Sequence, residues 1–402
     1  MDIKYIALII ALLVSTVSMP LIILFSKKFN LYDTVDGRKV HTGQISRLGG
    51  LGITLAFSIA LIILLVTGYF AEIKQNILFL VLAAICITAM GIIDDIVTLP
   101  AKIKLVPQII ASTLVLVGGF KFTTLSLGIY TINLGLLAFP LTFVWIIGVT
   151  NAVNLIDGID GQCGGLSVIA SATFCLFFFK EQNVPAMFIC LSLICSVMGF
   201  LFFNLPLPKA KIFMGDGGSQ TLGFILSVLP LLSSKGEIST VTILYAAAVL
   251  MIPLFDTIAA IWRRLREHRS IGSPDRFHLH HKLMMFGFSN RQALLIVCFF
   301  QTVICIFLCC SIWMGGILGT ILLFSVYLMG ILFLESNLPP AQQASALSLS
   351  THSMTLTSGK NAPRAQSWRQ AAPRRMLCRF AMATDSLPAA PDSTAAPTRS
   401  AA

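Results

Sequence analysis

Long apolar runs with almost no charge constrain the fold of this chain more than any other feature. Eleven runs approach the roughly 17–25 residues that a membrane-spanning helix needs. They are Tyr5–Phe25, Gly49–Phe70, Ile77–Ile93, Val106–Phe120, Leu134–Val149, Gly165–Phe179, Pro185–Phe203, Gly218–Leu232, Thr240–Trp262, Ala293–Cys310 and Trp313–Leu334. Only 11% of the residues are charged, whereas soluble domains carry about a quarter, which argues against a water-soluble globule. We therefore expect an all-α polytopic membrane protein with about eleven transmembrane helices.

The basic residues indicate the orientation of this bundle. If the runs alternate across the membrane, the loops on one side carry 16 Lys and Arg, against five on the other. Cytoplasmic loops are the ones enriched in Lys and Arg, so the N-terminus is predicted to lie outside. The cytoplasmic loops also hold most of the acids, and we expect the active site there. The net charge of +11 then reflects topology, and no nucleic-acid partner is expected.

The composition changes abruptly after residue 334. The segment 335–402 is rich in Ala, Ser, Thr, Pro and Gln and carries seven basic residues against three acids. Such a segment cannot bury enough apolar surface to fold alone. We predict a transmembrane domain over 1–334 and a disordered basic cytoplasmic tail over 335–402. The ten cysteines show no CxxC spacing, so neither disulfides nor a cysteine zinc site is predicted.

Two adjacent carboxylates, Asp94 and Asp95, end the third apolar run. At a helix C-terminus they face the negative end of the helix dipole, so a cation is expected to compensate for them. Lys102 and Lys104 follow the pair rather than adjoin it, which favours a metal ion or a substrate cation. The alternative is that the pair is only a polar signal that stops membrane insertion.

Two further loops on the same predicted face combine acids with glycines. In 151–161, which has no basic residue, Asn154, Asp157 and Asp160 share one face if the segment is helical. This favours a ligand site over an ordinary solvated loop. In 204–219, glycines surround Asp216 just before a predicted helix, where backbone N–H groups attract phosphate oxygens. A cation that bridges to a phosphate would account for this carboxylate.

The fourth group follows an Arg-rich run that by itself is typical of a topology anchor. It contains Arg276, His278, His280 and His281. Zinc is one alternative, but the acids elsewhere offer the oxygen ligands that suit Mg²⁺. Histidines beside an arginine can instead hold an anionic substrate, which is the interpretation we favour over zinc or a structural role.

A weaker group, His41 and Arg47, precedes the glycines of the second run, where it would grip phosphate or orient the helix. Phosphoryl transfer needs a metal to offset charge and cations to position phosphates. Together the groups offer ligands for such a metal and the cations. The rival function is a cation-coupled transporter using Asp94, Asp95 and Asp256. Transport predicts ionisable groups near the bilayer midplane, and only Asp256 is expected there.

The four motifs, in this order on alternate loops, resemble the polyprenyl-phosphate N-acetylhexosamine-1-phosphate transferase family (glycosyltransferase family 4) over roughly residues 1–334. The resemblance implies a bacterial inner-membrane enzyme that moves a sugar-1-phosphate from a UDP-sugar to undecaprenyl phosphate, releases UMP and needs Mg²⁺, with Mn²⁺ as a substitute. Leu279 interrupts the histidines, as in the branch that transfers N-acetylglucosamine-1-phosphate and primes O-antigen or other envelope polysaccharides. The alternative branch transfers phospho-N-acetylmuramoyl-pentapeptide and usually has three consecutive histidines.

The resemblance also implies roles for individual residues. Asp216 and Asn154 are expected to hold the metal, and Phe213 to stack on uracil. The expected catalytic residues are Asp94, Asp95, Asp157, Asp160, His278, His280 and His281, and the expected substrate contacts are Phe213, Arg276, Asn204 and Lys102. Asp94 would act as a base, position the lipid phosphate, or form a covalent intermediate. The expected partners are UDP-N-acetylglucosamine, undecaprenyl phosphate and membrane lipid, and a homodimer is compatible with the sequence. Ser46 departs from the family pattern, in which a proline is frequent.

Overall fold

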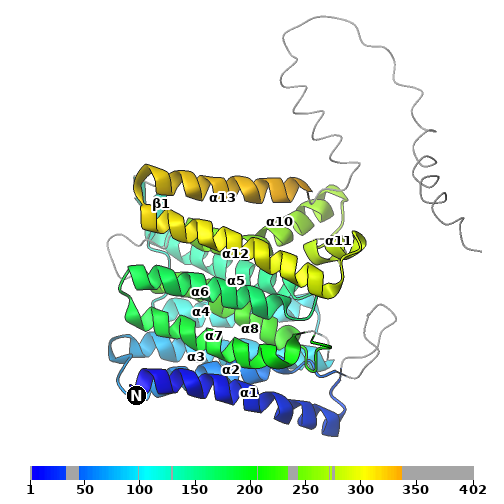
Figure 1. Cartoon of the computed structure of the whole chain (residues 1–402). Coiled ribbons are helices and arrows are strands. Elements are labelled where there is room, and N and C mark those ends of the chain that lie inside the picture. Colours follow the sequence, from blue (N-terminus) through cyan, green and yellow to red (C-terminus); the bar gives the residue numbers. More distant parts are fainter. Residues whose placement is uncertain are drawn as a thin grey trace, which may run out of the picture. The chain divides into compact units, whose positions relative to one another are not determined.

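The computed structural model describes residues 2–32, 45–97, 99–127, 130–205, 207–233, 243–270, 272–273 and 277–336. The predicted tail, apart from its first two residues, lies outside this part of the chain. Helices dominate the described residues (Figure 1). They are α1 Ile3–Phe29, α2 Gly49–Val66, α3 Lys74–Val97, α4 Ala101–Val117, α5 Ala138–Ile156, α6 Gln162–Lys180, α7 Val184–Asn204, α8 Gly215–Val228, α9 Ile243–Val249, α10 Met251–Arg266, α11 Leu279–Met285, α12 Asn290–Met314 and α13 Gly316–Ser336.

Seven helices of the described part are long and apolar enough to cross a membrane, namely α1, α2, α3, α5, α6, α7 and α12. The bent pair α9–α10 makes an eighth if it counts as one span. Each of the eleven predicted runs overlaps a helix, but α4 and α8 have only 17 and 14 residues. The protein is thus an all-α multi-pass membrane protein, while the count of eleven spans stays a prediction.

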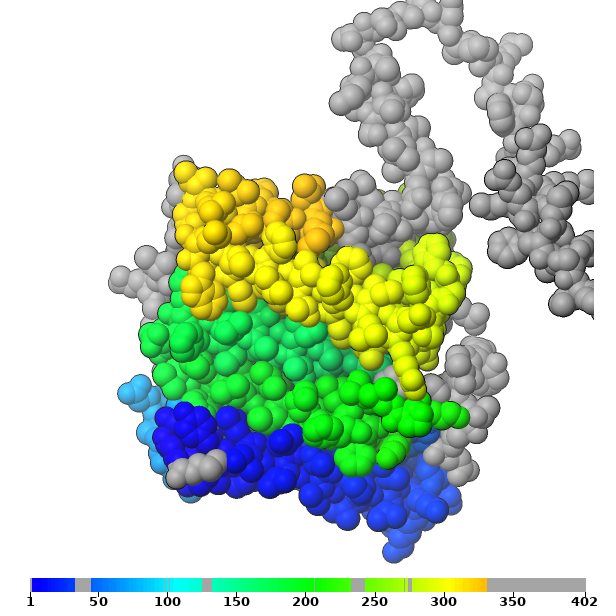
Figure 2. All heavy atoms as spheres, viewed as in Figure 1, coloured from blue at the N-terminus to red at the C-terminus, as the bar shows by residue number. Residues whose placement is uncertain are grey.

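The outer surface of the bundle is apolar, as lipid contact requires. Figure 2 shows a face formed by α1, α7, α6, α12 and α13. Large apolar side chains of these helices are exposed: Leu21 of α1 is 61% exposed and Phe299 of α12 is 65% exposed. A soluble monomer rarely exposes a contiguous apolar area of this kind, so these side chains are best explained as the lipid boundary.

The helices run roughly along one direction, so that the bundle has two ends (Figure 1). The N-terminus of α1 lies at one end together with an antiparallel hairpin of β1 (Thr124–Leu127) and β2 (Tyr130–Asn133), which was not expected. The short helix α11 lies at the other end. The predicted site loops therefore lie at the end opposite the N-terminus, and the assignment of that end to the cytoplasm stays a prediction.

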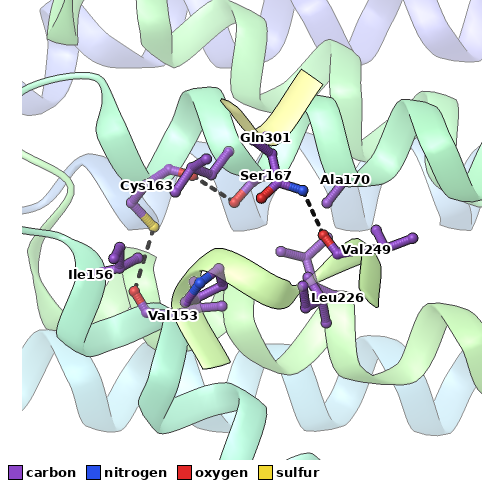
Figure 3. A pocket seen from close by; sticks show the side chains of 11 residues that line it. Val153, Ile156, Cys163, Ser167, Ala170, Leu226, Val249 and Gln301 are labelled. Carbon is purple, nitrogen blue, oxygen red and sulfur yellow. Dashed lines mark hydrogen bonds between the residues drawn. The ribbon is translucent and has the colours of Figure 1, made fainter. Parts of the chain in front are cut away.

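The ninth predicted run is not one straight helix. Helices α9 and α10 meet at an angle of 85°, and Pro253 explains why the helix breaks here. Proline has no N–H, so it cannot bond the carbonyl of Val249 four residues earlier. Gln301 of α12 donates to that carbonyl instead, at 2.6 Å (Figure 3). The cavity beside this bond measures only about 10 Å³, which is room for about one water molecule. The side chains around the break are therefore closely packed.

Helix α8 is the centre that positions the site, because almost all of it is buried between α2, α3 and α5. Its N-terminus meets two helices backbone to backbone. A Cβ atom added to Gly50 of α2 would lie 2.2 Å from the Gly218 nitrogen, and one added to Gly91 of α3 would lie 2.3 Å from the Gly217 Cα. In this structure these glycines permit the close packing that holds Asp216 in place.

Candidate active site

The two adjacent carboxylates at the end of α3 have different partners. Asp95 accepts hydrogen bonds from the backbone N–H groups of Asp216 at 2.9 Å and Gly217 at 3.0 Å. It therefore caps the N-terminus of α8, where the positive end of the helix dipole favours a carboxylate. Arg47 Nε lies 3.6 Å from the same carboxylate. These contacts offset the unfavourable dipole of α3.

Asp94 faces Lys104, which also contacts Asp216. Lys104 Nζ lies 2.5 Å from Asp94 Oδ2 and 2.9 Å from Asp216 Oδ2. Asp94 is almost fully buried and accepts a further bond from the Leu99 N–H at 2.6 Å. The inference that no lysine adjoins the pair was wrong, because the chain turns back after α3 and α4 returns Lys104 to the carboxylates.

Asp216 is the residue on which the charges converge. Arg47 Nη2 lies 3.9 Å from its Oδ1, and Lys104 contacts its Oδ2. Burial raises the pKa of Asp216, but the hydrogen bonds with Asp94 and Lys104 and the charges of Lys104 and Arg47 outweigh burial and lower that pKa. Asp216 is therefore an ionised carboxylate at neutral pH, as a ligand for a cation must be.

The 151–161 segment is helical only in part. Helix α5 ends at Ile156, so Asn154, Asp157 and Asp160 do not share a helix face, and this expectation was wrong. Asn154 Oδ1 accepts a bond from the Ser219 hydroxyl of α8 at 2.5 Å. Burial, followed by the charge of Asp216, raises the pKa of Asp157 to about 7. Asp160 is half-buried in the loop that follows.

Asn204, an expected substrate contact, joins two of the site loops. Its Oδ1 accepts the Gly161 N–H at 2.8 Å, and its Nδ2 donates to the Ile212 carbonyl at 2.9 Å. Both ends of the amide are thus used within the protein. The structure assigns Asn204 a clamping role between the loops before α6 and before α8, and its contact with substrate stays a prediction.

The histidine motif is fixed by an aspartate that the sequence analysis did not place at the site. His278 Nδ1 lies 2.7 Å from Asp256 Oδ2 of α10, and the Leu279 N–H donates to Asp256 Oδ1 at 3.0 Å. Asp256 therefore anchors the start of α11 as well as one imidazole. The sequence held one indication of this contact, because Asp256 is a carboxylate near the expected midplane and histidines follow in the next loop.

His280 connects this motif to the loop of Asp157. A Cβ atom on Gly158 would lie 2.1 Å from His280 Nε2, so only glycine fits against the ring. His280 is 1% exposed, and neither ring nitrogen has a hydrogen-bond partner among the described residues. Burial, followed by the charges of His281 and His278, lowers the pKa of His280 to about 3, so it is neutral at physiological pH. The His281 ring lies 4.2 Å from it, centroid to centroid.

The segment before α2 brings Arg47 to the site. The Phe213 N–H donates to the Ser46 carbonyl at 2.8 Å, and the Gly49 N–H donates to the Phe213 carbonyl at 3.0 Å. The Ser46 hydroxyl, at the family's frequent proline position, lies 2.7 Å from the Ser26 hydroxyl. Phe213 is half-buried beside these bonds. Arg47, a minor candidate from sequence, is thus a central cation of the site.

The remaining expected substrate contacts differ in what the structure describes. Lys102 is exposed in the first turn of α4, whereas Lys104 two residues later reaches the carboxylates. Arg276 lies outside the described residues. The roles predicted for both stay predictions.

The amino-acid sequence is similar to those of known proteins. A family model described as glycosyl transferase family 4 matches residues 77–234. A Bacillus subtilis (strain 168) protein named probable undecaprenyl-phosphate N-acetylglucosaminyl 1-phosphate transferase is 36% identical over 73% of this chain and 80% of its own length. Proteins named undecaprenyl-phosphate alpha-N-acetylglucosaminyl 1-phosphate transferase from Escherichia coli (strain K12) and Yersinia pestis are 31% and 30% identical, over 68% and 67% of this chain and 74% of each relative.

Proposed function

The chain belongs to glycosyl transferase family 4, and from this premise we propose that it transfers N-acetylglucosamine-1-phosphate from UDP-N-acetylglucosamine to undecaprenyl phosphate. UMP is the second product, and the lipid product primes an envelope polysaccharide. The observation that carries the proposal is the sequence similarity to relatives named undecaprenyl-phosphate N-acetylglucosaminyl 1-phosphate transferases. The apolar helices agree with a lipid acceptor, and we place the protein in the bacterial inner membrane with the site in the cytoplasm.

In the proposed reaction, an oxygen of the lipid phosphate attacks the phosphorus that carries the sugar. The bond from this phosphorus to the UMP oxygen breaks, and UMP leaves with the electron pair. A phosphate monoester has a second pKa near 6, so the nucleophile is largely ionised without a base. Arg47 and Lys104 are the cations that would hold the phosphates close, and Asp94 would set the position of Lys104.

The donor set fits a magnesium ion. The carboxylates of Asp94 and Asp216 converge on one cation, the Lys104 ammonium, and carboxylate and amide oxygens are the ligands that Mg²⁺ prefers. Among the described residues, no group of three or more His, Cys, Asp or Glu side chains is arranged to hold a metal. We propose that Asp216 and Asn154 would hold Mg²⁺ together with substrate phosphate oxygens, and that the ion would offset the diphosphate charge.

The test uses the purified full-length protein with undecaprenyl phosphate and UDP-N-acetylglucosamine labelled in the sugar. We expect the label to move into the organic phase with release of one UMP for each lipid formed. UDP-N-acetylgalactosamine and UDP-N-acetylmuramoyl-pentapeptide, used in parallel, define the donor. Failure to form labelled lipid, or faster transfer from the pentapeptide donor, would contradict the proposal.

A further inference from the structure

Three amide side chains lie behind the charged site, where α4, α5 and α8 meet. They are Gln108 of α4, Asn151 of α5 and Gln220 of α8, which we call the amide cluster. Gln108 is 1% exposed and Gln220 is 3% exposed, and Asn151 is half-buried. An amide removed from water is costly unless its hydrogen bonds are made inside the protein. The bonds within the amide cluster therefore constrain how these three helices pack.

Gln108 is the centre of the amide cluster. Its Nε2 donates to Asn151 Oδ1 at 3.3 Å and to Gln220 Oε1 at 3.2 Å. Asn151 Nδ2 donates in return to Gln108 Oε1 at 2.7 Å, and also to the Ile147 carbonyl of its own helix at 2.8 Å. Neither of these two amides can rotate without losing a bond, because each amide nitrogen has two partners. A bonded polar network of this kind rigidifies the core around it.

Each member of the amide cluster lies one helical turn from a residue of the candidate active site. Residues three or four apart lie on the same face of a helix. The pairs with this spacing are Lys104 and Gln108 on α4, Asn151 and Asn154 on α5, and Asp216 and Gln220 on α8. The amide cluster is thus a layer next to the one in which Lys104 Nζ lies 2.9 Å from Asp216 Oδ2.

Lys104 depends on this layer more than Asp216 does. The glycines beside Asp216 meet α2 and α3 backbone to backbone, which fixes its position directly. Helix α4 has an exposed side that includes Ile109 and Ile110, so only its inward side can fix it within the protein. A lysine reaches its partner through a flexible four-carbon stem, so the location of the ammonium depends on the α4 backbone. Gln108 ties the inward side of α4 to α5 and α8.

We propose that Gln108 is a positioning residue, which through the amide cluster holds α4 against α5 and α8. The Lys104 ammonium is thereby set between Asp94 and Asp216. The inference rests on the proposed function, because it takes the reaction from it. The alternative is that Gln108 contributes to stability alone. The two roles differ when Lys104 is absent, because a residue that acts through Lys104 then has little left to contribute to turnover.

Kinetics of the full-length protein distinguish these roles. Gln108→Met keeps the length of the side chain and removes its bonds. We expect it to lower kcat about tenfold, as is typical when the partner of a functional residue is changed, with KM for UDP-N-acetylglucosamine unchanged. In Lys104→Ala protein the same substitution should cost less than about twofold. A tenfold loss in both backgrounds, or no loss in either, would overturn the proposal.

The matched control removes a buried side-chain bond from the other end of α5. Thr142 is fully buried, and its hydroxyl oxygen accepts the Phe122 N–H at 3.0 Å. Thr142→Val should lower the stability of the protein and leave kcat unchanged. If it lowered kcat as much as Gln108→Met does, the effect of Gln108→Met would reflect stability alone, and the proposal would be overturned.

Amine labelling tests the position of Lys104 without the reaction, so it also serves for an inactive variant. Acylation needs a free amine, which the two carboxylates withhold at Lys104, whereas Lys102 on the same helix is exposed. Without Mg²⁺ and substrates, Gln108→Met should raise the labelling of Lys104 relative to Lys102 several-fold, measured by mass spectrometry. Gln220→Met removes one bond of the amide cluster, and it should shift the ratio in the same direction if Gln108→Met does not fold. Thr142→Val should not change the ratio.

The labelling also separates this proposal from the proposed function. Wild-type protein that protects Lys104 but transfers no sugar phosphate would refute the function, and a raised ratio in Gln108→Met would still support the positioning role. Active wild-type protein whose labelling ratio is the same as that of Gln108→Met would retain the function and overturn the positioning role.

Discussion

The carboxylate cluster around α8 and the histidine cluster around α11 lie at the same end of the bundle but are built differently. In the first, Asp94, Asp95 and Asp216 all have cationic or backbone partners within the protein. In the second, His280 is buried, neutral and without a hydrogen-bond partner among the described residues. A buried polar group without a partner is costly, so a ligand that bonds His280 would recover that energy. The first cluster is preorganised, and we expect a substrate to complete the second.

The largest expected effect comes from removing the charge on which the first cluster converges. Asp216→Asn should reduce transfer by about 10³-fold or more, because it removes the charge that pairs with Lys104 and also weakens the proposed binding of Mg²⁺. Turnover is measured against Mg²⁺ concentration, with Glu72→Gln at the opposite end of the bundle as the control. Wild-type turnover of Asp216→Asn at limiting Mg²⁺ would show that the metal assignment is wrong.

The second prediction separates two lysines of one helix. Lys104→Ala should lower kcat about 10²-fold, because it leaves Asp94 and Asp216 without their shared cation. Lys102→Ala, two residues earlier and exposed, should cost at least tenfold less. Steady-state kinetics of both variants provide the comparison, and equal losses would contradict the placement of Lys104 as the cation of the site.

The third prediction concerns the close backbone contacts of the first cluster, where Gly91 of α3 meets Gly217 of α8. Gly91→Ala should lower the free energy of unfolding by about 2 kcal/mol through overpacking, because its Cβ atom would lie 2.3 Å from the Gly217 Cα. Gly148→Ala is the control, since a Cβ atom there meets nothing within 4 Å. Thermal unfolding in detergent measures both. A Gly91→Ala protein as stable as Gly148→Ala would mean that α3 and α8 can separate freely.

The smallest expected effect belongs to the residue that orients the second cluster. Asp256→Asn should reduce kcat/KM about tenfold, as is usual when the partner of a functional histidine is changed. The loss should appear mainly in KM for the UDP-sugar if the histidines bind substrate, and Asp256→Ala should lose more. Glu267→Gln, at the exposed end of α10, is the control. If Asp256→Asn lowered the stability of the protein without changing kcat/KM, Asp256 would have only a structural role.

The sequence was sufficient to collect Asp94, Asp95, Asp216 and the histidines at one end of an all-α bundle, because alternate loops of a membrane bundle share a face. It was insufficient for Lys104, since a chain reversal between two helices brings it back to the carboxylates. The bend between α9 and α10 was also missed, because hydropathy counts apolar residues and carries no information on direction. Arg47 was underestimated for a related reason: its position depends on bonds between Ser46, Gly49 and Phe213.

The bond between Gln301 and the Val249 carbonyl has a consequence for how the protein is made. Its two residues are 52 positions apart, so α9 and α10 leave the ribosome well before the side chain that completes their bend. Until α12 is inserted, that carbonyl needs another partner, because an unbonded backbone group in lipid costs several kcal/mol. Asp256 and the His278 ring that it holds are thus expected to reach their final positions late in biosynthesis. A ribosome-bound intermediate that ends before α12 should contain the carboxylate cluster and lack an ordered histidine cluster.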